Sequence, residues 1–182
     1  MQKHREHRDY IETDMESDDS THTDLHSLAR NYFRLARLTL IAGTDQIRRC
    51  VLGKLDGEDL RTALKRNQSK LEDLLRRRII SKKQWSLLFP QDSNVDLEKH
   101  IDITLWLMLL RNIIPPAKLG VRNIRWDLAP KDDEKEWFHD VLRIRDTRNS
   151  LAHLIRPELD NDKFDRLWQY VSEALKRLDR EG

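Results

Sequence analysis

The sequence predicts an all-α protein, a single helical bundle of roughly five to seven helices that follows a disordered N-terminal tail. A chain of 182 residues suits one domain, because it is long enough to bury a substantial core. Only five Gly and five Pro interrupt a composition rich in Leu, Arg, Lys, Glu and Asp, which favours helices over a sheet. Beyond residue 24, apolar residues recur at three- and four-residue intervals, as one face of a helix requires.

The first 24 residues differ in composition from the rest of the chain. They carry three basic and eight acidic side chains and show no helical period. Such a segment cannot bury enough apolar surface to offset the loss of chain entropy on folding. We therefore expect a disordered acidic tail over residues 1–24 and one folded domain over residues 25–182.

The first half of the domain is expected to contain several helices separated by turn signals. One helical face is formed by Leu28, Tyr32, Leu35, Leu38 and Ala42. Gly43 is expected to interrupt or bend this helix, and Asp56-Gly57 is a turn signal before a further helix over Glu58 to Arg66. Ser69 is a candidate cap for the next helix, and Ser81-x-x-Gln84 is a candidate capping box for a short helix that Pro90 ends.

The second half is expected to hold a buried central helix and two further helices. Residues Ile101 to Ile114 are apolar nearly all round, which is typical of a helix surrounded by others. The pattern Asp133-x-x-Glu136 is a candidate capping box for a helix over residues 134–155. Beyond Pro157, a last helix has one apolar face made of Phe164, Leu167, Trp168, Val171, Leu175 and Leu178.

Composition also limits the functional classes. The single cysteine, Cys50, cannot form an internal disulfide, which fits a reducing compartment, and we expect a cytoplasmic protein with no membrane span, metal site or cofactor. Residues 48–83 carry twelve basic and five acidic side chains, an excess that can attract a polyanion such as RNA. The basic residues singled out here are Arg76, Arg77, Arg78, Lys82 and Lys83. The alternative interpretation is a set of solvated helix faces, and Trp85 and Trp126 are expected to pack under loops rather than to stack on bases.

One arginine stands in an apolar stripe of the predicted 134–155 helix. Val141, Ile144, Leu151 and Ile155 follow the spacing of a core-facing stripe, and Arg148 completes it. Burying a guanidinium without a partner would cost several kcal/mol. We therefore expect Arg148 to lie at a cleft, to meet a carboxylate, or to be held for a ligand.

A second set of polar residues, Arg145, Asn149 and His153, repeats every four residues and forms a ridge beside that stripe. Arg148 and His153 are five residues apart and diverge by about 140° around an ideal helix. Bending, long side chains or a second protomer must bring the two side chains to one point. Together they could perform phosphoryl transfer within RNA, since a histidine can move a proton while an arginine stabilises charge on the phosphate. Alternatively, Arg148 pairs with Asp146, Asp140 or another acidic neighbour and His153 is a partly buried structural histidine.

The segment Arg148-Asn149-Ser150-Leu151-Ala152-His153 resembles the R-x4–6-H signature of HEPN domains. Further similarity lies in residues 31–49, 71–90, 102–113 and 144–153 and in the stretch from Trp126 to Pro130. These blocks resemble the HEPN variety found in DAZ-interacting zinc-finger ubiquitin ligases and in many invertebrate repeat proteins, over roughly residues 28–155.

The resemblance implies a helical bundle that pairs as a homodimer through the signature helix, residues 134–155. It implies metal-independent RNA cleavage by Arg148 and His153 with Asn149 in support. From their charge, we expect Arg145 and the basic residues of 48–83 to contact RNA. Arg143 and Thr147 stand where a longer form of the motif has Glu and Lys. This departure from the motif argues against catalysis. Two hypotheses therefore stand: an RNA-binding domain with endoribonuclease activity, and a non-catalytic dimerisation or protein-interaction module in immune or ubiquitin-linked signalling.

Overall fold

The computed structural model describes residues 18–92, 95–120 and 124–180, and within these ranges the regular elements are all helices. The elements are α1 (Asp18–Arg37), η1 (Leu38–Ala42), α2 (Gly43–Gly53), α3 (Leu60–Arg66), α4 (Gln68–Arg76), α5 (Lys82–Leu88), α6 (Leu97–His100), α7 (Ile103–Ile113), α8 (Pro116–Leu119), α9 (Trp137–Ala152) and α10 (Asn161–Leu178). The all-α prediction is confirmed.

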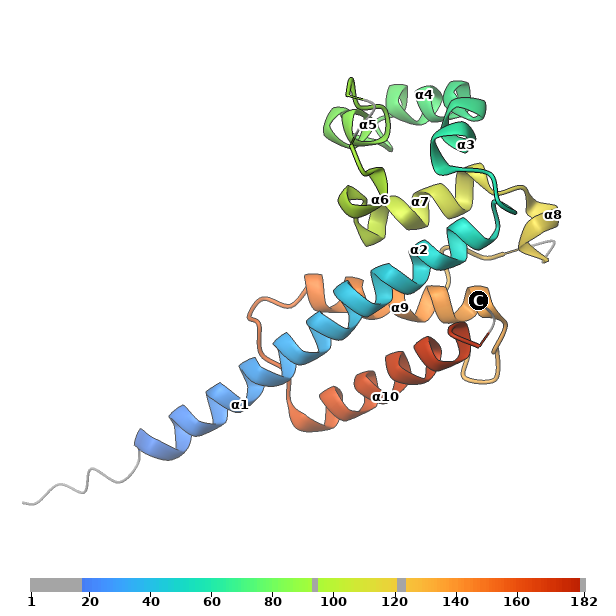
Figure 1. Ribbon diagram of the computed structural model, residues 1–182. Helices are drawn as coiled ribbons and strands as arrows, with labels where there is room; N and C mark the ends of the chain where they lie inside the picture. The colour runs from blue at the N-terminus through green and yellow to red at the C-terminus, as the bar shows by residue number, and fades with distance from the viewer. Residues whose placement is uncertain (1–17, 93–94, 121–123, 181–182) are drawn as a thin grey trace, which may run out of the picture.

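Helices α1 and α2 are joined by the π-helical turn η1 into one continuous rod (Figure 1). The start of α1 extends beyond the rest of the molecule, whereas α9 and α10 pack beside the rod and α3 to α5 lie at its far end. Since α1 begins at Asp18, it includes the last residues of the tail expected over 1–24, and residues 1–17 of that tail lie outside the described residues.

The π turn changes which residues of the rod face inward. A π turn holds one more residue than the preceding α-helical turns, so the buried face shifts along the sequence. Thr39 is completely buried and donates its hydroxyl to the Leu35 carbonyl at 2.8 Å, while Ala42, expected on the apolar face, is exposed. The prediction for Ala42 was wrong because simple helical spacing does not include the extra residue.

Gly43 was expected to interrupt or bend the helix. It does not interrupt the rod, and instead it allows a close helix crossing. A Cβ atom at this position would lie 2.7 Å from Cγ2 of Ile144 on α9. Only a glycine lets the two backbones approach this far, so residue 43 determines where α9 crosses the rod.

The core is centred on α7, the helix predicted to be surrounded by others. Trp106 and Leu109 on α7 are completely buried, and α7 packs mainly against α2. A second, smaller cluster consists of Leu35, Leu151, Leu159 and Phe164 and joins the rod to the end of α9 and the start of α10. Thus α9 is held at its middle by the main core and at its end by the second cluster.

The predicted helix caps were partly correct. Ser81 and Gln84 form the expected capping box at the start of α5. Ser69 instead lies inside α4, and the Asp133 pattern does not cap α9, whose N-cap residue Glu136 makes no side-chain cap. Residues Asp59, Asp102 and Asp160 cap α3, α7 and α10.

Helix α9 is shorter than the predicted 134–155 helix. It ends at Ala152, and beyond it Ile155 is fully exposed. The assignment of Ile155 to the core stripe was therefore wrong, because the chain leaves the helix before that position. No helix of the described residues is long and apolar enough to cross a membrane.

Candidate functional site

The predicted site lies at the C-terminal end of α9, the helix that carries most of its residues. Val141, Ile144 and Leu151 are buried, as the apolar stripe predicted. Arg148, in the same stripe, is half-buried, and its Nη1 donates to the Asn149 side-chain oxygen at 3.1 Å. Arg148 is thus neither enclosed in the core nor fully exposed.

Arg148 forms no ion pair with a carboxylate of the described residues. Of the two carboxylates proposed as its alternative partners, Asp146 is bound by Arg145, whose Nε and Nη2 lie 2.7 and 2.6 Å from Oδ1. Asp140 is bound by two other arginines, as described below. The alternative interpretation of Arg148 as half of a structural ion pair is therefore not supported by the geometry.

His153 is the C-cap residue of α9. Its backbone N–H donates to the Asn149 carbonyl at 3.1 Å and its side chain is exposed, so it is not a partly buried structural histidine. Among the described residues, no hydrogen bond or ion pair joins His153 to Arg148. Five residues apart on an ideal helix, the two side chains diverge by about 140°.

Arg145 has a different role from Arg148, although both belong to the predicted site. Besides its pair with Asp146, its Nη1 donates to the backbone carbonyl of Trp126. The guanidinium therefore attaches the loop over residues 124–128 to α9. Its accessible edge lines a groove that also contains Arg77, so two members of the predicted RNA-binding set meet there.

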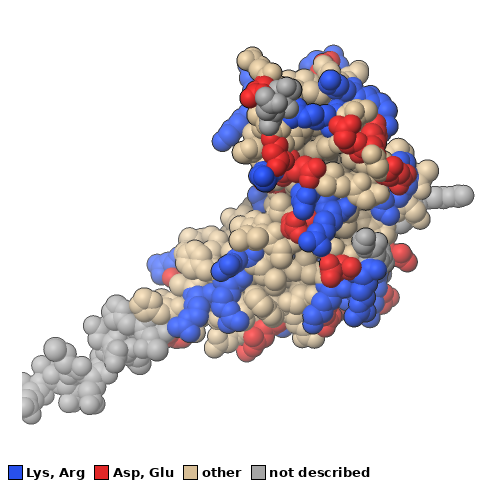
Figure 2. All heavy atoms as spheres, viewed as in Figure 1, with Lys and Arg blue, Asp and Glu red and all other residues tan. Residues whose placement is uncertain are grey.

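The other basic residues of that set are exposed on the end of α4 and the start of α5. They are Arg76, Arg78, Lys82 and Lys83. Figure 2 shows Lys and Arg side chains gathered over this part of the molecule, at the top of the view, with fewer acidic side chains among them. Arg76 is 3.4 Å from Asp73, a weak exposed pair that leaves its charge available to a polyanion.

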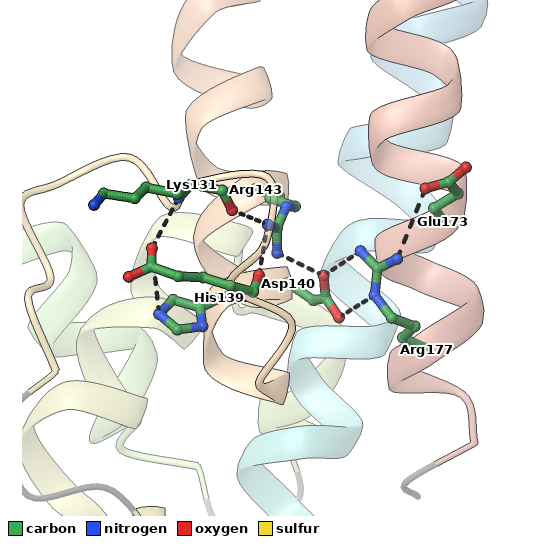
Figure 3. Close-up of polar contacts among 7 residues, drawn as sticks. Lys131, His139, Asp140, Arg143, Glu173 and Arg177 are labelled. Atoms are coloured by element: carbon green, nitrogen blue, oxygen red, sulfur yellow. Dashed lines mark hydrogen bonds and ion pairs between the residues drawn. The ribbon is translucent and has the colours of Figure 1, made fainter.

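The structure contains a buried charge network that the sequence did not reveal (Figure 3). Asp140 is completely buried and lies between two arginines. Arg143 donates to its Oδ1 at 3.0 Å, and Arg177 from α10 donates to Oδ1 at 2.7 Å and to Oδ2 at 2.9 Å. The hydrogen bond to Asp140 raises the pKa of Arg177 above its usual value.

Arg143 also fixes the loop that leads into α9. Its Nη2 donates to the backbone carbonyls of Lys131 and Glu134, both at 2.6 Å. Arg143 stands where a longer form of the motif has Glu, and in this chain that position is buried and holds the loop and Asp140 in place. The i, i+3 spacing of Asp140 and Arg143 was a signal available in the sequence, whereas Arg177, distant in the chain, was not recognisable as their partner.

Among the described residues, no cluster of three or more His, Cys, Asp or Glu side chains is arranged to hold a metal ion. The groups available at the end of α9 are therefore a guanidinium, an amide and an imidazole. These can bind a phosphate, stabilise charge on it and move a proton.

Comparison with known proteins gives a consistent family. The family model for DZIP3/hRUL138-like HEPN matches residues 57–182. The chain is 26% identical over 161 residues to two curated proteins named E3 ubiquitin-protein ligase DZIP3, from Mus musculus and from Homo sapiens. The alignments cover 85% of this chain and 13% of each relative, so the chain spans only a small part of their length. No solved structure matches the chain significantly.

Proposed function

The chain belongs to the DZIP3/hRUL138-like HEPN family, and on this premise we propose that it binds single-stranded RNA and cleaves it without a metal ion at the end of α9. The observation that carries the proposal is the state of Arg148. Its guanidinium has no carboxylate partner among the described residues, whereas Arg143, Arg145 and Arg177 all do. A half-buried guanidinium without a carboxylate partner is suited to a phosphate.

In the proposed reaction the ribose 2′-oxygen attacks the adjacent phosphorus, and the bond from phosphorus to the 5′-oxygen of the next nucleotide breaks. A base takes the 2′-hydroxyl proton and an acid gives a proton to the leaving 5′-oxygen, so the products are a 2′,3′-cyclic phosphate and a 5′-hydroxyl. His153 moves the proton, and Arg148 stabilises the charge that builds on the phosphate oxygens. Asn149 holds the Arg148 guanidinium in position through its side-chain oxygen.

We further propose that two copies of the chain assemble the site. Most of the first half of α9 is buried, whereas its end offers exposed Ser150, Ala152 and His153 to a partner, and fully exposed Ile155 follows. A dimer through this end would cover Ile155 and place the histidine of one copy near the arginine of the other. Such a dimer would bring an arginine and a histidine together even though the two side chains diverge within one chain.

The direct test incubates the purified chain with single-stranded RNA in EDTA and identifies the product ends. We expect fragments ending in a cyclic phosphate, with cleavage reduced by about 100-fold or more in His153→Ala and in Arg148→Ala. The matched controls are His100→Ala and Arg180→Ala, which remove an exposed histidine and an exposed arginine far along the chain from the motif. Cleavage that persists in both site variants would assign the activity to a contaminating nuclease.

The same exposed end favours a second function, a non-catalytic interaction module. The matched relatives are named as E3 ubiquitin-protein ligases, and such a protein can use a dimerising helical domain to assemble. Here Ile155 and Arg148 would be interface anchors. This second function replaces the first if two results are obtained together. The wild-type chain forms a dimer but leaves the RNA uncut, and Ile155→Asp makes the chain monomeric.

A further inference from the structure

A groove of about 460 Å³ lies where the end of α4, the helix α7, the loop over residues 124–128 and the middle of α9 meet. Its apolar lining includes Ile79, Met108 and Trp126, and its charged lining consists of Arg77, Arg111, Arg145 and Asp127. The volume is within the range that pockets for small ligands occupy. The groove therefore offers both an apolar surface and an excess of positive charge.

Two of these arginines keep their hydrogen-bonding capacity. Arg77 lies 3.8 Å from Asp73, and Arg111 lies 3.7 Å from Asp127, so neither pair is close enough for a hydrogen bond. Both side chains are more than half exposed, at 65% and 52%. Arg145, in contrast, is engaged by Asp146 and by the Trp126 carbonyl, and serves as part of the wall.

The chain places an apolar residue in solvent at the rim of the groove. Arg78 adopts a left-handed backbone, φ 59°, and the N–H groups of Ile79 and Ile80 both donate to the Leu74 carbonyl. This reversal at the end of α4 buries Ile80 but leaves Ile79 52% exposed. An exposed aliphatic surface beside two available guanidiniums matches a ligand that is apolar on one side and anionic on the other.

The groove adjoins the end of α9 that carries the proposed cleavage site. Arg145 on its wall is one turn before Asn149, on the same face of the helix, and two turns before His153, a rise of about 12 Å. Further exposed basic residues lie at the end of α4 and the start of α5, namely Arg76, Lys82 and Lys83. A polyanion that lies in the groove can therefore continue in both directions.

We propose that this groove binds one nucleotide of single-stranded RNA, beside the nucleotide that is cleaved. The phosphate is held by Arg77 and Arg111, and the base lies against Ile79, Met108 and Trp126, which revises the expectation that Trp126 only packs under a loop. A duplex cannot present an unstacked base, so the site selects single strands. This assignment rests on the proposed RNA function and adds to it a binding subsite away from Arg148 and His153.

The test measures binding of a fluorescent octameric single-stranded RNA to the whole chain at several salt concentrations. The probe carries 2′-O-methyl groups, because the proposed cleavage needs a free 2′-hydroxyl. We expect Arg77→Ala/Arg111→Ala to weaken binding at least 10-fold. The double variant should also reduce the slope of log affinity against log salt by about 0.7, because the two arginines together hold one phosphate of a single strand. Ile79→Ser should weaken binding about 5-fold without changing the salt slope, because it removes apolar contact and no charge. Arg180→Ala, an exposed arginine beyond the end of α10 and outside the proposed RNA-binding surface, is the matched control and should change affinity less than 2-fold.

The outcomes distinguish this inference from the function on which it rests. If the wild-type chain binds RNA and the double variant binds equally well, the groove is not the subsite and the proposed function remains. If the wild-type chain binds no RNA, the proposed function fails and the groove assignment fails with it. If duplex RNA, or a glutamate octapeptide, binds as tightly and loses as much affinity in the variants, the groove holds an anion without reading a base, and the inference is overturned.

Discussion

The two ends of α9 use arginine in opposite ways. At the start of the helix, Arg143 and Arg177 surround the buried carboxylate of Asp140, and the group is sealed between α9 and α10. At the end, Arg148 donates a hydrogen bond to the side-chain oxygen of Asn149 and forms no ion pair with a carboxylate of the described residues, and His153 is exposed. Charge at the first end is neutralised and maintains the fold, whereas charge at the second end is available to a ligand. Mutations at the two ends should therefore separate stability from function.

The largest expected effect is at the sealed end. Asp140→Ala leaves two arginines without their carboxylate, one of them buried, and should lower the free energy of unfolding by about 3–5 kcal/mol. Urea denaturation followed by circular dichroism measures this. Asp165→Ala, an exposed carboxylate on α10, should change stability by less than about 0.5 kcal/mol. A loss below about 1 kcal/mol in Asp140→Ala would show that the network does not hold α9 in place.

A smaller effect is expected where the middle of α9 crosses the rod. Gly43→Ala places a methyl group 2.7 Å from Ile144 Cγ2, and should destabilise by about 1–2 kcal/mol even though alanine favours the helix. Gly53→Ala is the matched control, because no atom lies within 4 Å of its added Cβ. The control should gain up to about 1 kcal/mol. Equal gains in both variants, measured by thermal unfolding, would contradict the close crossing.

The end of α4 offers a test of the basic surface. Arg78→Gly relieves the left-handed backbone and should stabilise the chain by about 0.5–1 kcal/mol. Arg76→Gly, two residues earlier and inside α4, should instead destabilise it by up to about 1 kcal/mol. If Arg78 contributes to RNA binding, as the sequence predicted, its glycine variant becomes more stable while its affinity for RNA falls. A loss of stability would indicate that the Arg78 side chain makes contacts that outweigh the backbone strain.

The smallest change in stability is expected at the open end. Arg148→Ala removes a side chain whose polar contact is with Asn149, so the free energy of unfolding should change by less than about 1 kcal/mol. Arg143→Ala is the counterpart at the sealed end and should cost several times more. Comparing the denaturation midpoints of these two variants directly measures the contrast between the ends. Equal losses would show that Arg148, too, is structural.

Local patterns in the sequence predicted much of the fold. The apolar run near residues 101–114 became the buried helix α7, and the capping box of Ser81 and Gln84 is formed. These features depend on neighbours within a few residues, so spacing is sufficient to identify them. The extra residue of η1 and the early end of α9 changed the faces that Ala42 and Ile155 present, because simple helical spacing continued across both positions does not include either feature.

The candidate site was predicted in the same partial way. Sequence spacing singled out Arg148 as a charge in an apolar stripe, and the structure places it half-buried at the edge of the bundle. The spacing in the sequence could not show which arginines of α9 would pair with a carboxylate. That depends on Arg177, which lies on another helix and reaches Asp140 only once the chain has folded.

The sequence by itself therefore determined that the chain is helical, that α7 is central, that a HEPN-like signature is present and that Arg148 occupies an unusual position. Only the tertiary structure decided that Asp140 and Asp146 are already bound, that Arg77, Arg111 and Arg145 share one groove, and that Arg148 has no carboxylate partner among the described residues. The physical reason is the range of the interactions. Helical periodicity is set by neighbours three and four residues apart, whereas the neutralisation of a charge depends on groups that folding brings together from distant parts of the chain.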